Sequence, residues 1–327
     1  MATIKQVAKQ ANVSVATVSR VMNNNGYVSA EARAAVEQAI ADLDYAPNRV
    51  ARSLFTKTSG LIGLIMPDIT NPFFPQLARA IEDAANRHGY QVVLCNTDEQ
   101  LEKEQSYLIA LHTMHVDGLI ITTNHSDNPN YEKLDLPMVA LDRIVKSGID
   151  AVISDGYEGG RLAADTLIAS GATRLVHIAG PEQLQTVKRR TEGFLDVAGD
   201  RLIGMTHSNF TFKEALTAAQ TLFDTHWPFD GLFAANDVIA AAVLQEVVRR
   251  NVRVPEELQV IGYDGIELGE MTSPPLTTIS QPIYEMGRLA TERLLDLIEK
   301  KDTATKEILL PVTLTERQTT KRKGQDR

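Results

Sequence analysis

The sequence has a single cysteine, Cys95, in 327 residues, so no disulfide can form within the chain, and no Cys/His set stands at zinc-ligand spacing. Its apolar runs fall far short of the roughly 20 residues that span a bilayer. The opening MATIKQVAKQ lacks the apolar core of a signal peptide. We therefore expect a soluble, cytoplasmic protein that binds no metal.

Motifs of the common nucleotide-using and hydrolytic enzymes are missing as well. The sequence has no Gly-x-x-x-x-Gly-Lys-[Ser/Thr] loop, no Gly-x-Gly-x-x-Gly after a predicted strand and no Gly-x-Ser-x-Gly elbow. His112 and His115 share a helix face without an acidic or cysteine partner at ligand spacing. Asp142 stands beside Arg143, which should keep its carboxylate ionised. The sequence thus predicts a protein that binds ligands, is not an enzyme and uses no cofactor.

Negative charge is in excess, but it is unevenly distributed. The chain carries a net charge of −9, yet six basic and four acidic residues fall between Met1 and Thr56, which leaves +2 on this head and −11 on the remainder. Such asymmetry indicates two parts with different partners. Nucleic acid therefore stays open as a partner of the head.

Three short helices are predicted at the start of the chain. Apolar residues recur at helical spacing over residues 3–12, 15–22 and 30–43. The first two are joined by a brief turn, which is the helix-turn-helix pattern. A three-helix domain that binds nothing would show the same spacing, so the pattern alone does not establish DNA binding.

The outward-facing residues of the second helix favour DNA as the partner. They are uncharged or basic, which suits the major groove, and short polar residues around them can hydrogen-bond phosphates. The residues expected to contact DNA here are Thr3, Ser14, Val15, Ala16, Thr17, Arg20, Asn23 and Ser29.

From about Thr3 to Leu54 the chain resembles the DNA-binding head of the lactose-repressor/galactose-repressor (LacI/GalR) family of transcriptional repressors, over the run VAKQANVSVATVSRVMNNNGYVSAEARAAVEQAIADLDYAPNRVARSL. In that family, two residues that open the recognition helix and a later arginine read bases. The resemblance assigns these roles to Val15, Ala16 and Arg20. Arg20 suits bidentate contact with guanine, whereas the other two can offer apolar contact, for example to thymine methyls.

Residues 48–54, NRVARSL, follow the predicted helices. Seven residues are too few for an isolated helix in water, so we expect them to fold only on DNA. The resemblance implies a hinge helix that pairs with its twin in a homodimer on a palindromic operator, with Leu54 as a wedge in the minor groove. An ordinary linker is the alternative. The residues implied in DNA contact are Asn48, Arg49, Ala51, Arg52 and Leu54.

Beyond Leu61, short apolar runs alternate with amphipathic helices. Such repeats predict an α/β fold of two doubly wound parallel-sheet lobes with a ligand cleft between them. One series of strands is predicted at 61–66, 91–94, 118–121 and 138–141, and a second at 151–154, 174–178, 231–234 and 259–261. The expected domains are a helix-turn-helix head at 1–47, a hinge helix and linker at 48–59, an effector-binding and dimerisation core at 60–320, and a basic tail at 321–327.

Polar and aromatic residues follow many of these strands, where α/β folds bind ligands. Aromatic rings stack on the apolar faces of sugars, and Asp, Asn, Arg and Gln pair with sugar hydroxyls. Singly, each residue has a structural explanation, such as a helix cap for Asn236 or a core position for Phe73. Their repeated placement favours one shared site. They are Asn71, Phe73, Phe74, Asp142, Arg143, Arg190, Phe210, Asn236, Asp264 and Gln281.

The body resembles the periplasmic sugar-binding proteins, the fold that this repressor family carries as its sensor. Ribose-binding members hold their ligand with the same residue types in the same local motifs. The runs DITNPFFPQLARAIEDAANRHGY and VIGYDGIELGEMTSPPLTTISQP are similar to ribose-responsive repressors. The resemblance implies a repressor that D-ribose releases from operator DNA. The alternatives are a regulator of the same family for sucrose or fructose, and a transport-type sugar-binding protein, which would have no use for residues 3–54.

Overall fold

The computed structural model describes residues 2–22, 25–45, 58–123, 125, 128, 130–145, 148–301 and 304–321. The chain divides into two compact units, Met1–Ser59 and Gly60–Arg327. The predicted DNA contacts of the hinge, Asn48, Arg49, Ala51, Arg52 and Leu54, lie outside the described residues, as do Asn23 and residues 322–327 of the tail.

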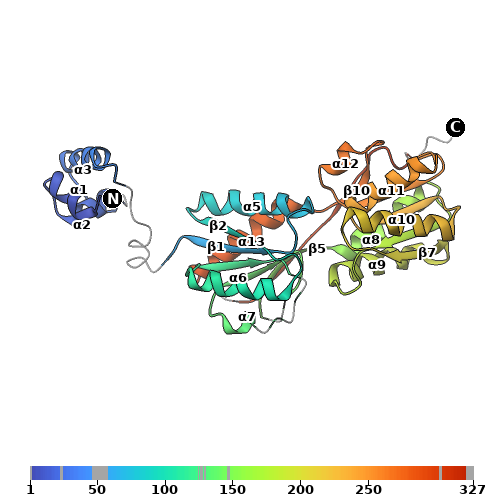
Figure 1. The fold of residues 1–327 in the computed structure, drawn as a ribbon, viewed down its shortest axis with the longest axis horizontal. Helices are drawn as coiled ribbons and strands as arrows, with labels where there is room; N and C mark the ends of the chain where they lie inside the picture. The colour runs from blue at the N-terminus through green and yellow to red at the C-terminus, as the bar shows by residue number, and fades with distance from the viewer. Residues whose placement is uncertain are drawn as a thin grey trace. The chain divides into compact units, whose positions relative to one another are not determined.

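The first unit contains the three predicted helices, α1 (Ile4–Gln10), α2 (Val15–Met22) and α3 (Ala30–Asp42) (Figure 1). Thr3 starts α1 with a capping box, in which its hydroxyl accepts from the Gln6 backbone N–H while the Gln6 side chain accepts from the Thr3 N–H. The inward faces of the helices form one small apolar core, made of Val7, Ala8, Ala11, Val18, Val21, Val36 and Ala39.

The first lobe of the second unit is built on a six-stranded sheet in the order β11-β5-β4-β3-β1-β2. All of its strand pairs are parallel. One face packs on α5 and α13, and the other on α6 and α7. The elements are β1 (Leu61–Met66), α5 (Phe73–Arg87), β2 (Gln91–Asn96), α6 (Leu101–Thr113), β3 (Gly118–Ile121), α7 (Asn130–Lys133), β4 (Met138–Leu141), β5 (Asp150–Ser154), α13 (Ile283–Ile298) and β11 (Glu307–Leu310).

The second lobe repeats this architecture with a sheet in the order β12-β10-β9-β8-β6-β7. Its pairs are parallel except for β10 and β12. Helices α8 and α9 cover one face, and α10 and α11 the other. The elements are α8 (Gly156–Ala169), β6 (Leu175–Ala179), α9 (Gln185–Ala198), the 3-10 helix η1 (Gly199–Arg201), β7 (Leu202–His207), α10 (Phe212–His226), β8 (Gly231–Ala234), α11 (Asp237–Arg249), β9 (Gln259–Asp264), α12 (Leu268–Met271), β10 (Thr277–Ser280) and β12 (Thr313–Thr315).

The two predicted lobes are confirmed, but the assignment of residues 151–154 to the second strand series is wrong. This strand, β5, pairs with β4 and β11 in the first sheet. The chain crosses between the lobes after β5, again between β10 and α13, and a third time between β11 and β12. Three crossing segments therefore join the lobes, and both lobes are assembled from separate stretches of sequence (Figure 1).

Helices α8 and α9 approach so closely that glycine is required where they cross. A Cβ on Gly160 of α8 would lie 2.0 Å from the backbone oxygen of Arg190, and one on Gly193 of α9 would lie 1.9 Å from the backbone oxygen of Tyr157. Neither position can hold a larger residue unless the helix backbones separate. This contact fixes α9, which carries Arg190, against the lobe.

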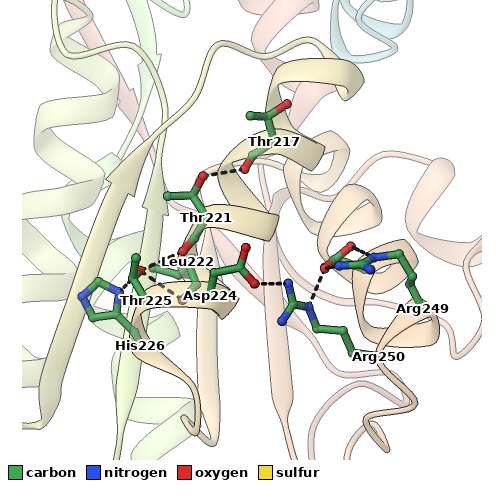
Figure 2. A network of polar contacts seen from close by, with 9 residues as sticks. Thr217, Thr221, Leu222, Asp224, Thr225, His226, Arg249 and Arg250 are labelled. Atoms are coloured by element: carbon green, nitrogen blue, oxygen red, sulfur yellow. Dashed lines mark hydrogen bonds and ion pairs between the residues drawn. The ribbon is translucent and has the colours of Figure 1, made fainter.

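On the opposite face, an ion-pair cluster ties α10 to α11. Arg250 bridges Asp224 of α10 and Glu246 of α11, with nitrogen–oxygen distances of 2.5 Å to each (Figure 2). Hydrogen bonds from Arg249 and Arg250 lower the pKa of Glu246 to about 2. Threonine hydroxyls on α10, at Thr217, Thr221 and Thr225, donate to carbonyls one turn earlier.

Within the residues described, no helix is both long and apolar enough to cross a membrane.

Candidate functional site

All ten residues predicted to bind the effector line one pocket between the lobes. Asn71 lies in the connection between β1 and α5, Phe73 and Phe74 are the first residues of α5, and Asp142 and Arg143 follow β4. The second lobe contributes residues from α9, from the ends of β7, β8 and β9, and from the connection after β10. The pocket is lined by Asn71, Phe73, Phe74, Asp142, Arg143, Thr186, Arg190, Phe210, Asn236, Asp264 and Gln281.

Two phenylalanines form the apolar wall on the first lobe. The rings of Phe73 and Phe74 meet edge to face, with centroids 5.2 Å apart, and both are buried in the lobe core. The guanidinium carbon of Arg143 lies 5.7 Å from the Phe74 centroid. Asn71 accepts the Phe73 backbone N–H through Oδ1 at 3.1 Å. These rings therefore serve both the core and the pocket.

Arg190 is the main cation contributed by the second lobe. Its Nη1 donates to the Ala235 carbonyl at 2.7 Å, and its Nη2 lies 3.8 Å from Oδ1 of Asp264. The guanidinium stacks on Tyr263, with Cζ 3.6 Å from the ring centroid. Carbonyl, carboxylate and ring together hold one orientation of a buried positive charge.

Asp264 is hydrogen-bonded to the segments that connect the two lobes. Gln281 donates to its Oδ1 at 2.7 Å, and Ser154, at the end of β5, donates to the Gln281 side-chain oxygen. Burial raises the pKa of Asp264 to about 8, against the opposing influence of Arg190. A hydrogen-bonded chain thus connects two crossing segments to one pocket carboxyl.

Both pocket aspartates have a left-handed backbone, with φ of +64° at Asp142 and +107° at Asp264. Non-glycine residues adopt such conformations at an energetic cost, and they persist where the surroundings impose them. At Asp142, burial and the neighbouring cations act in opposite directions on the pKa. Burial raises the pKa of Asp142, and this outweighs the opposing charges of Arg143 and Arg190.

Asp237 holds the loop that follows Asp264, and it was not among the predicted effector contacts. Its Oδ2 accepts the backbone N–H groups of Gly265 and Ile266, each at 2.9 Å, and its Oδ1 accepts the Thr278 hydroxyl at 2.6 Å. The preceding residue, Asn236, caps α11 by accepting the Ile239 N–H at 2.8 Å. Asn236 therefore has the cap role considered for it and a place in the pocket wall.

Asp237→Asn should flatten the pH dependence of stability. Burial raises the pKa of Asp237 to about 7, while a carboxyl of the unfolded chain titrates near 4. The folded state therefore keeps a proton that the unfolded chain loses in this window. The free energy of unfolding falls as pH rises from about 4 to about 7, by up to ~1.4 kcal/mol per pH unit.

The measurement is urea unfolding of Asp237→Asn at several values from pH 4 to pH 8. Asp264, whose pKa is about 8, contributes in both proteins, so the slope should shrink rather than vanish. The exposed Asp165→Asn is the control and should keep the wild-type slope. Identical slopes for Asp237→Asn and the wild type would contradict the assignment.

Several buried polar atoms of the pocket have no hydrogen-bond partner among the described residues. They are Oδ1 of Asp142, Nη1 of Arg143 and Nε of Arg190. Nε of Arg143 also has no hydrogen bond, but it forms an ion pair with Oδ2 of Asp142 at 3.5 Å. The pocket lining thus combines hydrogen-bond donors, acceptors and aromatic rings, which is the chemistry that suits a polyhydroxylated ligand.

This inner pocket is small as it stands. Its cavity measures about 20 Å³, roughly the room that one water molecule needs. A sugar can enter only if side chains withdraw or the lobes part. An outer chamber of about 390 Å³ adjoins it and shares Asn71, Phe74 and Phe210 with its wall.

In the head, the residues expected to read bases are exposed along α2. Val15 is 41% exposed, and Ala16 and Arg20 are also exposed, whereas Thr17 is half-buried. The Ser14 hydroxyl accepts the Thr17 N–H at 3.1 Å, and that of Ser29 accepts the Ala32 N–H at 3.3 Å. The hydroxyls of Thr3, Ser14 and Ser29 thus act as helix caps, and DNA contact by them remains a prediction.

Thr186, Tyr263 and Asp237 are the site residues that the sequence did not reveal. Thr186 lies one turn before Arg190 on α9, a spacing that places both on one helix face. Tyr263 immediately precedes Asp264 in β9. Successive side chains of a strand point to opposite faces, so the sequence did not predict that Tyr263 and Asp264 both contact Arg190.

A three-helix head and a two-lobed core with a polar, aromatic-walled pocket between the lobes define a ligand-responsive DNA-binding regulator. Residues 3–48 match "Bacterial regulatory proteins, lacI family", and residues 164–320 match "Periplasmic binding protein-like domain". A ribose operon repressor of Halalkalibacterium halodurans is 49% identical to this chain over 98% of both proteins. The chain belongs to the LacI family of bacterial regulatory proteins, so the predicted class of a regulator rather than an enzyme is confirmed.

Two solved structures show the same relationship. The Lac repressor dimer bound to operator and the anti-inducer ONPF is similar at a TM-score of 0.88 and 28% identity, covering 97% of this chain and 98% of that one. A LacI family transcriptional regulator from Enterococcus faecium with bound ribose is similar at a TM-score of 0.72 and 34% identity, covering 80% of this chain and 98% of that one.

Proposed function

We propose that this chain is a cytoplasmic repressor of a ribose uptake or utilisation operon. It binds a palindromic operator as a homodimer through its heads and is released by D-ribose. The observation that carries the proposal is the pocket, where ten predicted residues from both lobes meet. Among the described residues, several of their buried donors and acceptors have no hydrogen-bond partner. A named ribose operon repressor among the relatives and bound ribose in a similar regulator support the choice of sugar.

The pocket chemistry supports a small neutral sugar. Phe73, Phe74 and Phe210 offer rings for the apolar faces of a furanose or pyranose. Asp142, Arg143, Arg190, Asn236, Asp264 and Gln281 offer acceptors and donors for its hydroxyls. Val15, Ala16 and Arg20 are proposed to read bases, with Thr3, Ser14, Thr17, Asn23 and Ser29 at phosphates.

The proposed switch is closure of the lobes on the sugar. The three crossing segments move when the lobes close, and the hydrogen-bonded chain Ser154–Gln281–Asp264 links two of them to the pocket. Movement of the first lobes in the dimer then separates the paired hinge segments. The coupling between sugar and operator is expected at ~1–3 kcal/mol and acts in both directions, so operator DNA must weaken sugar binding.

An operator gel shift at fixed salt, with and without D-ribose, tests DNA binding, effector identity and sign together. The operator is obtained by in vitro selection with the purified full chain. We expect D-ribose to release the DNA, while sucrose and fructose do not. If ribose tightens operator binding, it acts as a co-repressor rather than an inducer. If sucrose or fructose releases the DNA, that sugar is the effector in place of ribose. Failure to select any DNA would favour a sugar-binding protein without a regulatory role.

Leu54→Ala is expected to weaken operator binding by at least ~1 kcal/mol, about fivefold, without changing sugar affinity. The physical reason is loss of the apolar wedge that stabilises the bent minor groove. Operator titration and sugar calorimetry on the same protein measure the two quantities. Unchanged operator affinity would remove the hinge assignment.

A further inference from the structure

An outer chamber of the cleft adjoins the inner pocket. It measures about 390 Å³, and it shares Asn71, Phe74 and Phe210 with the inner wall. The side chains that line this chamber are therefore next to the space that an effector would occupy.

The charge of this chamber is negative. Asp68, Asp98 and Glu99 line it, and none of the described residues in its lining is basic. Lys103 offsets one of these charges, since its Nζ lies 2.5 Å from Oδ2 of Asp98. Among the described residues, Asp68 and Glu99 have no ion-pair partner, and the body as a whole has an excess of acidic residues.

The inner pocket supplies no surplus of positive charge to offset this. Arg143 is paired with Asp142, at 3.5 Å between Nε and Oδ2, and Arg190 lies 3.8 Å from Asp264. The carboxylate of Glu99 also acts on the inner site. Burial lowers the pKa of Arg143, while the charges of Asp142 and Glu99 oppose that shift.

We propose that Asp68, Asp98 and Glu99 are specificity-determining residues that exclude phosphorylated and other anionic sugars from the effector pocket. The proposal rests on the sugar-binding function proposed above, and it restricts the effector to uncharged sugars. A sugar phosphate bound in the inner pocket would place up to two negative charges against these carboxylates. Like charges at such range repel, and the repulsion is reduced by salt.

Glu99 offers the cleanest test. Asp68 accepts hydrogen bonds from Thr70, and Asp98 is paired with Lys103, so changing either would disturb the loop. The Glu99 carboxylate is exposed, and within the described part of the chain it has no hydrogen-bond or ion-pair partner. Glu99→Lys therefore reverses one charge of the rim with little structural change.

The matched control is Glu256→Lys, which makes the same charge change on an exposed residue. Glu256 precedes β9, whose opposite end carries Asp264, so it lies at the far edge of the sheet from the pocket. Calorimetric titrations use the full chain with D-ribose and with D-ribose 5-phosphate, at low and at 0.5 M salt.

We expect the wild type to bind ribose 5-phosphate at least 100-fold more weakly than ribose. Glu99→Lys should raise the ratio of phosphate affinity to ribose affinity at least fivefold over that of Glu256→Lys, and it should lose most of this gain at high salt. No gain over Glu256→Lys, or a wild type that binds both sugars within tenfold, overturns the proposal. If the wild type does not bind ribose, the proposed effector is wrong. That outcome is distinguishable from failure of the charge proposal, because the affinities of Glu99→Lys and Glu256→Lys for ribose 5-phosphate can still be compared.

Discussion

Arg190→Met is expected to abolish the sugar response while operator binding persists. The guanidinium is buried between the Ala235 carbonyl, Asp264 and the Tyr263 ring, and its Nε has no partner among the described residues. Loss of a charge-assisted hydrogen bond to sugar costs about 1.5–3 kcal/mol, and removing the nearby cation raises the pKa of Asp264 further. We expect sugar affinity to fall at least 100-fold, about 2.7 kcal/mol.

Calorimetry with D-ribose measures this loss, and a gel shift shows whether the variant still binds operator and ignores sugar. Arg189→Met is the control, because Arg189 is the neighbouring arginine on the same helix but is 52% exposed and pairs with Glu192. Arg190→Lys keeps the charge but not the planar fork, and should fall between the two. Wild-type sugar affinity in Arg190→Met would exclude this residue from the effector site.

Gly160→Ala should destabilise the second lobe by about 3 kcal/mol, since overpacking of a tight contact has costs of this size. The new Cβ would lie 2.0 Å from the Arg190 backbone oxygen and 2.8 Å from the Phe194 nitrogen. Neither atom is a flexible side-chain end, so α8 and α9 must separate. Because the obstructed oxygen belongs to Arg190, sugar affinity should fall with stability.

Urea unfolding of the full chain measures the first effect and calorimetry the second. Gly156→Ala is the control in the same helix. Its Cβ would make ordinary contacts of 3.5 Å or more, and its expected change is within ~0.5 kcal/mol. Equal stability of the two variants would show that the helices can part at little cost.

The sequence predicted the pocket residues well because their signal is local. In a parallel α/β sheet, residues that follow strands gather at one edge, so a strand pattern is enough to bring Asp142, Asn236 and Asp264 together. The partners of Asp237 could not be found in this way. They lie 28 to 41 residues further along the chain, and no local pattern specifies such a contact.

The wrong assignment of β5 has the same cause. Its five residues, DAVIS, read as a buried strand whichever sheet they join. Membership of the first sheet is decided by pairing with β4 and with β11, which begins at Glu307. The strands β7, β10, β11 and β12 were missed. Length is not the reason, because β3, β4 and β8 have only four residues each and were predicted from their continuous apolar runs. In contrast, β7, β11 and β12 are partly exposed, and β10 consists mainly of threonine and serine.

The threefold crossing of the chain also sets the order in which the protein can fold during synthesis. The head is complete early, but the first lobe lacks α13, whose Met286, Ala290 and Leu294 belong to its core. About 150 residues separate β4 from α13, so at ribosomal rates of 5–20 residues per second the apolar face of β1, β3 and β4 waits roughly 8–30 s for its cover. During that interval the nascent first lobe is exposed to chaperones and to aggregation, while the head is already complete.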